Sequence, residues 1–130
     1  MIRKDLTKAE EQIMKILWKI KKGFVKDIIS HFKMPKPAYN TVSTIVRILE
    51  RKNFVSHKVY GKTHEYFPLI EKKDYTKNFL SKFIGNYFDN SFGQLLSFFS
   101  RENDLNVKEL EELMKLVEKE IKLKKNNKNV

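Results

Sequence analysis

Short hydrogen-bonding side chains and two arginines recur at helical spacing in residues 38–54, "AYNTVSTIVRILERKNF". They are Asn40, Ser43, Thr44, Arg47 and Arg51. Side chains three or four positions apart share one face of a helix, so these residues would form one polar face. A face that is only solvated is usually built from Glu, Lys, Gln and Ala. Short donors and acceptors beside arginines instead favour close contact with a polar ligand.

An apolar stripe indicates that the other face of this segment is buried. Val42, Ile45, Val46 and Leu49 follow the i, i+3, i+4, i+7 rule, and period-two alternation is absent. The many β-branched residues lower helix propensity only weakly. The pattern therefore predicts a helix with one buried face, which ends near Asn53, a residue that tolerates left-handed backbone.

Two helices are predicted upstream of this segment. "LTKAEEQIMKILWKI" starts with a capping box, in which Thr7 is the N-cap and Glu10 follows three residues later. We expect Gly23 to end this helix. "VKDIISHF" predicts a second helix of two turns, which Pro35 and Pro37 stop before the third begins. Two short helices joined by a tight turn form a helix-turn-helix.

A β-hairpin is predicted next, because apolar and polar residues alternate from Val55 to Leu69 on both sides of Gly61. A helix-turn-helix followed directly by a basic hairpin is a winged helix. The expected fold is thus mainly α with a small β-hairpin. We expect a winged helix-turn-helix at residues 1–70, a helical module at 71–124 and a disordered tail at 125–130.

The second half is rich in aromatic residues that three helices cannot enclose. Six of the ten phenylalanines fall in about fifty residues of predicted helix. The excess predicts a partner surface, most simply a second copy of the chain with two-fold symmetry. The alternative is that these rings pack back onto the winged helix. The expected dimer-interface residues are Phe79, Phe83, Phe88, Phe92, Phe98 and Phe99, with a heptad seam of Val107, Leu110, Met114, Val117 and Ile121.

The charge distribution indicates a polyanionic partner. The 130-residue chain has a formal net charge of +11. Residues 1–70 hold 15 Lys/Arg against 6 Asp/Glu, which is a net charge of +9. Residues 71–130 therefore carry a net charge of only +2. A basic excess in the half with the helix-turn-helix favours nucleic acid over an acidic membrane surface.

Several other classes fit the sequence poorly. There is no cysteine for a disulfide or thiolate metal site, no secretory signal and no apolar run of spanning length, so a soluble cytoplasmic protein is expected. His57, His64 and nearby Glu65 on an exposed hairpin do not make a closed zinc site. Phosphate-loop and nucleophile–base signatures are missing. We expect no enzymatic activity, metal or cofactor, and no direct membrane binding.

A helix with this polar face fits the major groove of double-stranded DNA. Asn pairs with adenine, Arg with guanine, and the Thr41 methyl group suits thymine. Arg51 and the hairpin lysines are expected on the phosphate backbone. The predicted DNA-binding residues are Asn40, Thr41, Ser43, Thr44, Arg47, Arg51, Lys58 and Lys62.

A protein-interaction adaptor is the alternative function. Winged helices sometimes bind proteins, and the C-terminal helices could pair with a different chain. An adaptor face would be expected to carry exposed aromatic or aliphatic anchors, which Asn40, Ser43, Thr44 and Arg47 are not.

Three stretches, "LTKAEEQIMKILW", "AYNTVSTIVRILERKNFV" and "GKTHEYFPLI", resemble the penicillinase repressor family of bacterial winged-helix repressors (the BlaI/MecI/CopY type). The similarity covers nearly all of residues 6–122. The resemblance implies a homodimer that binds a two-fold symmetric operator and represses a resistance or stress operon.

Relief of repression in the antibiotic-responsive branch involves a membrane sensor metalloprotease and cleavage within the dimerisation region. The bond that matches the cleaved one is Phe98–Phe99, where those members have Asn-Phe. Copper-responsive members carry a C-terminal Cys-x-Cys pair that this chain lacks, which excludes copper sensing of that kind. Asn53 stands where the family usually has glycine. Family members vary at the positions of Asn40 and Ser43, so the base preference of other members cannot be transferred to these two residues.

Overall fold

The computed structural model describes residues 5–102 and 105–128. The chain divides into two compact units, residues 1–79 and 80–130. The elements are α1 (Lys8–Ile20), α2 (Val25–Ser30), α3 (Tyr39–Arg51), β1 (Val55–Tyr60), β2 (Thr63–Pro68), α4 (Lys72–Phe88), α5 (Phe92–Glu102) and α6 (Val107–Lys128). This order confirms the predicted winged helix followed by helices.

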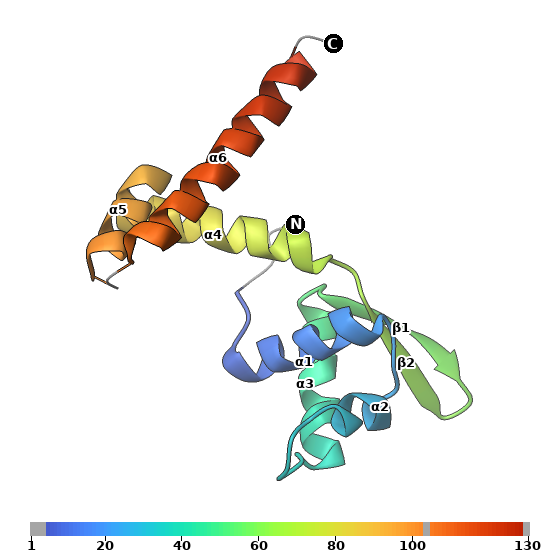
Figure 1. The fold of residues 1–130 in the computed structure, drawn as a ribbon. Coiled ribbons are helices and arrows are strands. Elements are labelled where there is room, and N and C mark those ends of the chain that lie inside the picture. Colours follow the sequence, from blue (N-terminus) through green and yellow to red (C-terminus); the bar gives the residue numbers. More distant parts are fainter. Residues whose placement is uncertain (1–4, 103–104, 129–130) are drawn as a thin grey trace. The chain divides into compact units, whose positions relative to one another are not determined.

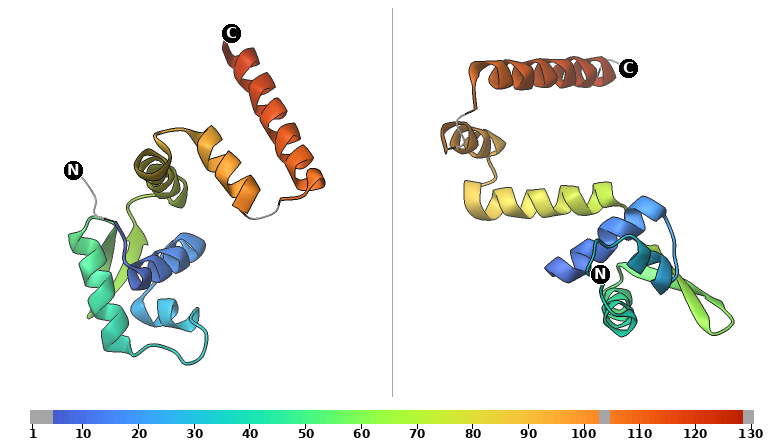
Figure 2. Two further views of the ribbon diagram at one scale, coloured as in Figure 1. Left: turned by 90° about the vertical axis from the view of Figure 1, so that its left-hand side faces the viewer. Right: turned by 60° about the horizontal axis from the view of Figure 1, so that its bottom comes forward.

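The first unit is a three-helix cluster with an antiparallel hairpin that projects beyond the helices (Figures 1 and 2). One hydrophobic core joins α1, α2, α3 and the base of the hairpin. Its buried side chains are Ile13, Met14, Leu17, Val25, Ile28, Val42, Val46, Leu49, Phe54, Val55, Tyr66 and Ile70. The core therefore holds all three helices and the hairpin in a single packing arrangement.

The start of α1 confirms the predicted capping box. The Thr7 N–H donates to Glu10 Oε1 at 2.9 Å, and the Glu10 N–H donates to Thr7 Oγ1 at 3.2 Å. The predicted end at Gly23 is wrong. The helix ends at Ile20, and Lys21 takes a φ of 76° while its N–H still donates to the Leu17 carbonyl.

Gly23 instead pairs with the hairpin. Its N–H donates to the Tyr66 carbonyl at 2.9 Å, and the Tyr66 N–H donates to the Gly23 carbonyl at 2.8 Å. A Cβ at this position would lie 2.8 Å from Ile20 Cδ1 and 3.2 Å from Asp27 Cβ. Glycine suits this position because a larger residue would have to displace the end of the Ile20 side chain and crowd the Asp27 Cβ, and the bridge ties β2 to the α1–α2 connection.

The predicted two-faced helix is confirmed in α3. Val42, Val46 and Leu49 are fully buried, whereas Ile45 at the edge of the stripe is half-buried. The helix ends before Asn53, whose φ of 67° is the left-handed conformation expected for it. The Phe54 N–H then donates to the Leu49 carbonyl and closes the end of the helix.

A two-residue turn closes the hairpin, since Tyr60 pairs with Thr63. Gly61 has a φ of 63°, and Lys62 is not among the described residues with positive φ. A positive φ at only the first central residue is the pattern of a type II′ turn, which matches the natural twist of the strands. Gly61 therefore suffices without an Asn-Gly pair.

A buried ion pair joins α1 to the end of α3. Lys52 Nζ lies 2.7 Å from Glu10 Oε1 and 3.0 Å from Oε2, and Glu10 is only 4% exposed. Burial raises the pKa of the Glu10 carboxyl, but the hydrogen bonds from Lys52 and Thr7 and the lysine charge lower it more. The pKa therefore lies below its ordinary value.

The start of α4 belongs to the first unit, which extends beyond the boundary expected at residue 70. Trp18 Nε1 donates to the Ile70 carbonyl at 2.8 Å. The Tyr75 ring lies 5.8 Å from both the Trp18 and the Phe54 ring, centroid to centroid. Burial raises the pKa of the Tyr75 phenol. This aromatic contact holds the first turns of α4 to the winged helix.

The second unit contains little buried surface of its own. No residue of α4 or α5 is fully buried, and none of the described side chains of α6 is. Inside the unit, Phe88 packs against Phe83 and Phe98 with ring centroids 5.8 and 5.7 Å apart.

Helix α6 ends at Lys128 and therefore extends into the segment 125–130, for which we expected disorder. Lysine is a good helix former, and its positive charge is favourable at a helix C-terminus. Residues 129–130 lie outside the described part of the chain.

We expect Glu10→Gln to lower the free energy of unfolding by about 1–3 kcal/mol at pH 7, because the Lys52 ammonium loses its counter-charge. Glutamine still serves the capping box. A carboxyl with a lowered folded-state pKa contributes stability that is lost as the pH falls through that pKa. The difference between wild type and variant should therefore shrink below about pH 4.

Urea unfolding at pH 7 and pH 3.5 measures this difference. Glu11→Gln is the matched control, since Glu11 pairs with Lys15 at 3.2 Å on the exposed surface of the same helix. Its effect should stay below about 0.5 kcal/mol. A pH-independent loss for Glu10→Gln would contradict the role of the carboxylate charge.

The position of Tyr75 predicts the length of chain that the winged helix needs. A fragment of residues 1–79 should be more stable than one of residues 1–70 by about 1–2 kcal/mol, because the shorter fragment uncovers Phe54 and Trp18. Thermal unfolding followed by the fluorescence of Trp18 compares the two. Tyr75→Ala in the longer fragment should remove most of the gain, and equal stability of all three would place the boundary back at residue 70.

Candidate nucleic-acid interface

The predicted polar side chains of α3 lie on one exposed face of the first unit. Asn40, Thr41, Thr44, Arg47 and Arg51 are exposed, and Ser43 is half-buried beside them. The face is presented because Val42, Val46 and Leu49 are held in the core on the opposite side. The helix therefore presents short donors and acceptors along its length, as needed for contact within the groove of a partner.

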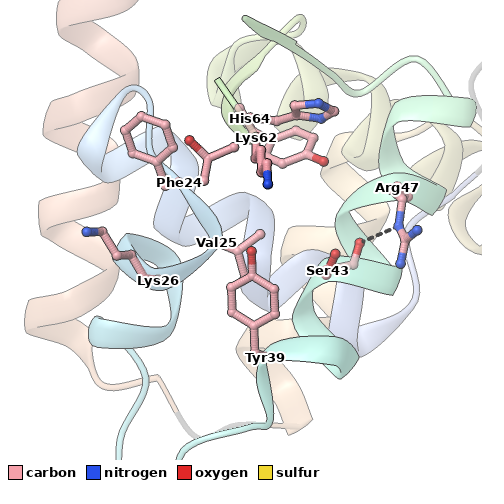
Figure 3. A pocket seen from close by; sticks show the side chains of 10 residues that line it. Phe24, Val25, Lys26, Tyr39, Ser43, Arg47, Lys62 and His64 are labelled. Atoms are coloured by element: carbon pink, nitrogen blue, oxygen red, sulfur yellow. Dashed lines mark hydrogen bonds between the residues drawn. The ribbon is translucent and has the colours of Figure 1, made fainter. Parts of the chain in front are cut away.

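Arg47 is partly positioned by its own helix. Its Nε donates to the Ser43 carbonyl at 3.3 Å, one turn earlier (Figure 3). This bond uses one of the five guanidinium N–H groups and leaves both terminal nitrogens for a ligand. Thr44, Arg47, Glu50 and Arg51 line a shallow depression on the same surface. The arginines thus flank a carboxylate within an otherwise basic face.

That carboxylate is engaged by the hairpin. His57 Nδ1 lies 2.6 Å from Glu50 Oε2, and the His57 ring stacks on His64 with centroids 4.1 Å apart. Tyr66 lies close to both rings. Burial raises the pKa of the Tyr66 phenol, and the Glu50 charge acts in the same direction. Side chains of β1 and β2 are therefore packed against the end of α3.

A groove separates the first turns of α3 from the hairpin turn, and we call it the α3–wing groove. Its volume is about 440 Å³. Figure 3 shows the Lys62 ammonium group and the Tyr39 hydroxyl directed into it from opposite sides, with Ser43 and Arg47 along one wall. The lining residues are Phe24, Val25, Lys26, Tyr39, Ser43, Arg47, Lys62, Thr63, His64 and Tyr66.

The structure brings only some of the predicted residues to this groove. Lys62 lines it with Ser43 and Arg47, whereas Lys58 does not. Lys58 pairs across the hairpin with Glu65, and strand alternation places it on the opposite face from His57 and its partner Tyr66.

Sequence analysis missed the contribution of Tyr39, Thr63 and His64 to the groove. An aromatic residue at the first position of α3, directly before Asn40, was the available signal for Tyr39. The other two depend on the hairpin register, which places Thr63 and His64 at the start of β2, where both line the groove. That register is set by the length of the turn, which composition alone does not reveal.

Two further properties concern the described ranges 5–102 and 105–128. Within them, no group of three or more His, Cys, Asp or Glu side chains is arranged to hold a metal ion. None of the helices there combines the length and the apolar character needed to cross a membrane.

Comparison with known proteins identifies the family. The penicillinase repressor family profile matches residues 6–119. The chain belongs to the penicillinase repressor family. This confirms the resemblance found in the sequence, and a family of repressors agrees with the expectation that the protein is not an enzyme.

Individual family members share modest identity over nearly their whole length. The methicillin resistance regulatory protein MecI of Staphylococcus aureus (strain N315) is 28% identical over 116 residues, covering 88% of this chain and 94% of its own. The penicillinase repressor of Bacillus licheniformis is 23% identical over 122 residues, covering 93% and 95%. The solution structure of the DNA-binding domain of the repressor BlaI is 26% identical, with a TM-score of 0.49 over 57% of this chain and 94% of that one.

Proposed function

We propose that this protein is a sequence-specific DNA-binding repressor that acts as a homodimer on a two-fold symmetric operator. The observation that carries the proposal is the exposed polar face of α3, opposite the buried side chains of Val42, Val46 and Leu49, in a chain of the penicillinase repressor family. An α-helix with short polar side chains approaches base edges closely in the major groove.

Each polar residue of α3 has a role in this proposal that follows from its place on the helix. Asn40 and Arg47 read bases, since Asn makes two hydrogen bonds to adenine and Arg makes two to guanine. Thr41 and Thr44 lie beside them and contact thymine methyl groups or base edges. Arg51, in the last turn, and the hairpin lysines contact phosphates, which fix the register without reading sequence.

The proposed homodimer rests on the exposed apolar surface of the second unit. Among its large apolar side chains, Tyr87 is 73% exposed, Phe92 62%, Val107 69% and Met114 61%. Exposed apolar surface of this extent is typical of protein–protein interaction sites. Phe88 and Leu110, which we expected in the interface, are half-buried within the single chain, and Phe88 packs on Phe83 and Phe98.

Relief of repression by proteolysis is a further part of the proposal, with a resistance operon as the target and a membrane sensor metalloprotease as the upstream system. The Phe98–Phe99 bond lies inside α5, and both side chains are about half exposed. A protease would have to unwind this turn, since proteases bind extended backbone. A cut here would separate α6 from the winged helix and leave the DNA-reading face unchanged.

Base readout is tested with the full-length protein on a duplex selected from a random pool. Asn40→Ala and Arg47→Ala should each weaken binding to the selected site by about 1–3 kcal/mol and relax preference at one base pair per half-site. Arg51→Ala should weaken binding to selected and random duplexes alike and lower the salt slope by about one. Titrations by fluorescence anisotropy at several salt concentrations measure both quantities.

The control for these variants is Gln12→Ala, at an exposed position of α1 away from the polar face. It should change neither affinity nor preference. If all three substitutions on α3 reduced binding equally on every duplex, α3 would not be reading bases, and a protein-interaction adaptor would become the better proposal.

The dimer seam is tested by two substitutions at positions that are equally exposed in the single chain. Met114 and Leu116 are 61% and 62% exposed and lie two residues apart on α6, but only Met114 belongs to the heptad seam. Met114→Asp should shift the protein to monomer and weaken operator binding about 10²-fold or more, because two linked contacts become independent. Leu116→Asp should leave the dimer intact.

Sedimentation velocity at micromolar concentration distinguishes these outcomes. A monomeric wild-type chain, or equal effects of the two substitutions, would contradict the proposed seam.

A further inference from the structure

The α3–wing groove has the chemistry of an anion site. It is lined by the cations Lys26, Arg47 and Lys62 and by the hydroxyls of Tyr39 and Ser43, with no aspartate or glutamate among its lining residues. The Thr63 hydroxyl also lines the groove, but it already donates to the Tyr60 carbonyl at 2.8 Å. Within residues 5–102 and 105–128, neither Lys26 nor Lys62 forms an ion pair. The groove therefore holds unneutralised positive charge beside neutral hydrogen-bond donors, which favours a ligand with several anionic oxygens.

The directions in which the side chains point show which part of the groove could hold an anion. In Figure 3 the Lys62 ammonium and the Tyr39 hydroxyl point into the same space from the hairpin turn and from the first turn of α3. The Lys26 ammonium points away from that space. Arg47 is fixed on the adjacent wall by its bond to the Ser43 carbonyl.

Part of the groove is apolar. This favours a ligand in which an apolar group is attached to the anionic group. Phe24, Val25 and the Tyr39 ring also line the groove. The Phe24 ring packs edge-on against Tyr60 at 5.8 Å, which fixes its orientation. In a nucleotide the phosphate is attached to a sugar ring, whose C–H surface would lie against these side chains while the phosphate contacts the Lys62 ammonium.

We infer that the α3–wing groove binds one phosphate with its attached sugar, the phosphate being held between the Lys62 ammonium and the Tyr39 hydroxyl. Two sources carry this chemistry, the backbone of bound DNA and a free nucleotide. The inference rests on the proposed function for the first source only. It adds Tyr39, which sequence analysis did not assign, as a positioning residue for α3.

The site has a mechanical consequence for DNA binding. Its two principal donors come from different elements, α3 and the hairpin turn. One phosphate bound by both fixes the distance between the reading helix and the wing on the duplex. Such a contact carries no base information, but it sets the register in which Asn40 and Arg47 meet the base edges.

The test combines protein variants with single neutral methylphosphonate linkages placed along a duplex selected from a random pool. With the full-length protein, Tyr39→Phe and Lys62→Gln should each weaken binding about 10-fold. Lys62→Gln should lower the salt slope by about one, whereas Tyr39→Phe, which removes a neutral donor, should leave the slope unchanged. Both losses should disappear at the same single linkage in each half-site, because that phosphate is their shared partner.

Lys26→Gln is the matched control, since Lys26 lines the same groove with its ammonium turned away. It removes the same charge, but its smaller loss should persist whichever linkage is neutral. Losses from Tyr39→Phe and Lys62→Gln that no single linkage cancels would overturn the DNA backbone as the source.

The second arm titrates the isotope-labelled full-length protein with thymidine 5′-monophosphate. Chemical-shift changes confined to the groove, abolished by Lys62→Gln and competing with the duplex, would support the site with a free nucleotide as its source. If the nucleotide shifts no groove signal and the linkage scan shows no cancellation, the inference is wrong. If the wild-type protein bound all duplex sequences equally, the proposed function would be refuted. The nucleotide titration would still test the groove in that case.

Discussion

The burial of Val42, Val46 and Leu49 is the constraint on which the rest of the structure depends. These three side chains fix the rotation of α3 about its own axis, and that rotation decides which residues face outward. Turning the helix by one residue would move the polar face by about 100° and bring Asn40 and Arg47 toward the core. Core packing therefore has a direct functional consequence here, since a change that lets α3 rotate would misdirect the polar face without unfolding the protein.

The hairpin is held in register with α3 by several independent contacts. The Leu69 N–H donates to the Phe54 carbonyl at 2.8 Å, directly after α3, and the Gly23–Tyr66 bridge holds the other edge of β2. The His57–Glu50 contact joins the strand to the last turn of the helix. The Leu69–Phe54 contact lies at the base of the hairpin, whereas the other two lie at the His57–Tyr66 pair, so together they restrain the tilt of the hairpin as well as its position. The groove between α3 and the turn is a product of that restraint.

Local patterns predicted much of this fold. The capping box at Thr7, the two faces of α3, the left-handed Asn53 and the hairpin around Gly61 each depend on a few neighbouring residues, so the sequence contains the whole signal. Gly23 shows the limit of such reasoning. A glycine after a lysine pair has the local signature of a helix end, but its role is a backbone bridge to Tyr66, more than forty positions away. The same limit applies to Tyr39, which lines the α3–wing groove, and to Tyr75, whose ring contacts Trp18 and Phe54, because these positions matter only through residues distant in the sequence.

The two units differ in where their apolar surface is placed, and this difference suits a regulator. The winged helix buries its core within one chain, including an ion pair whose carboxylate is almost inaccessible. The second unit leaves large apolar side chains exposed on α4, α5 and α6. The core that holds the face of α3 outward therefore lies within one chain and does not depend on association. In the proposed homodimer, avidity for a two-fold operator would depend on the second unit instead. Under that proposal, an agent that acts only on the second unit would lower operator occupancy while the face of α3 stays unchanged.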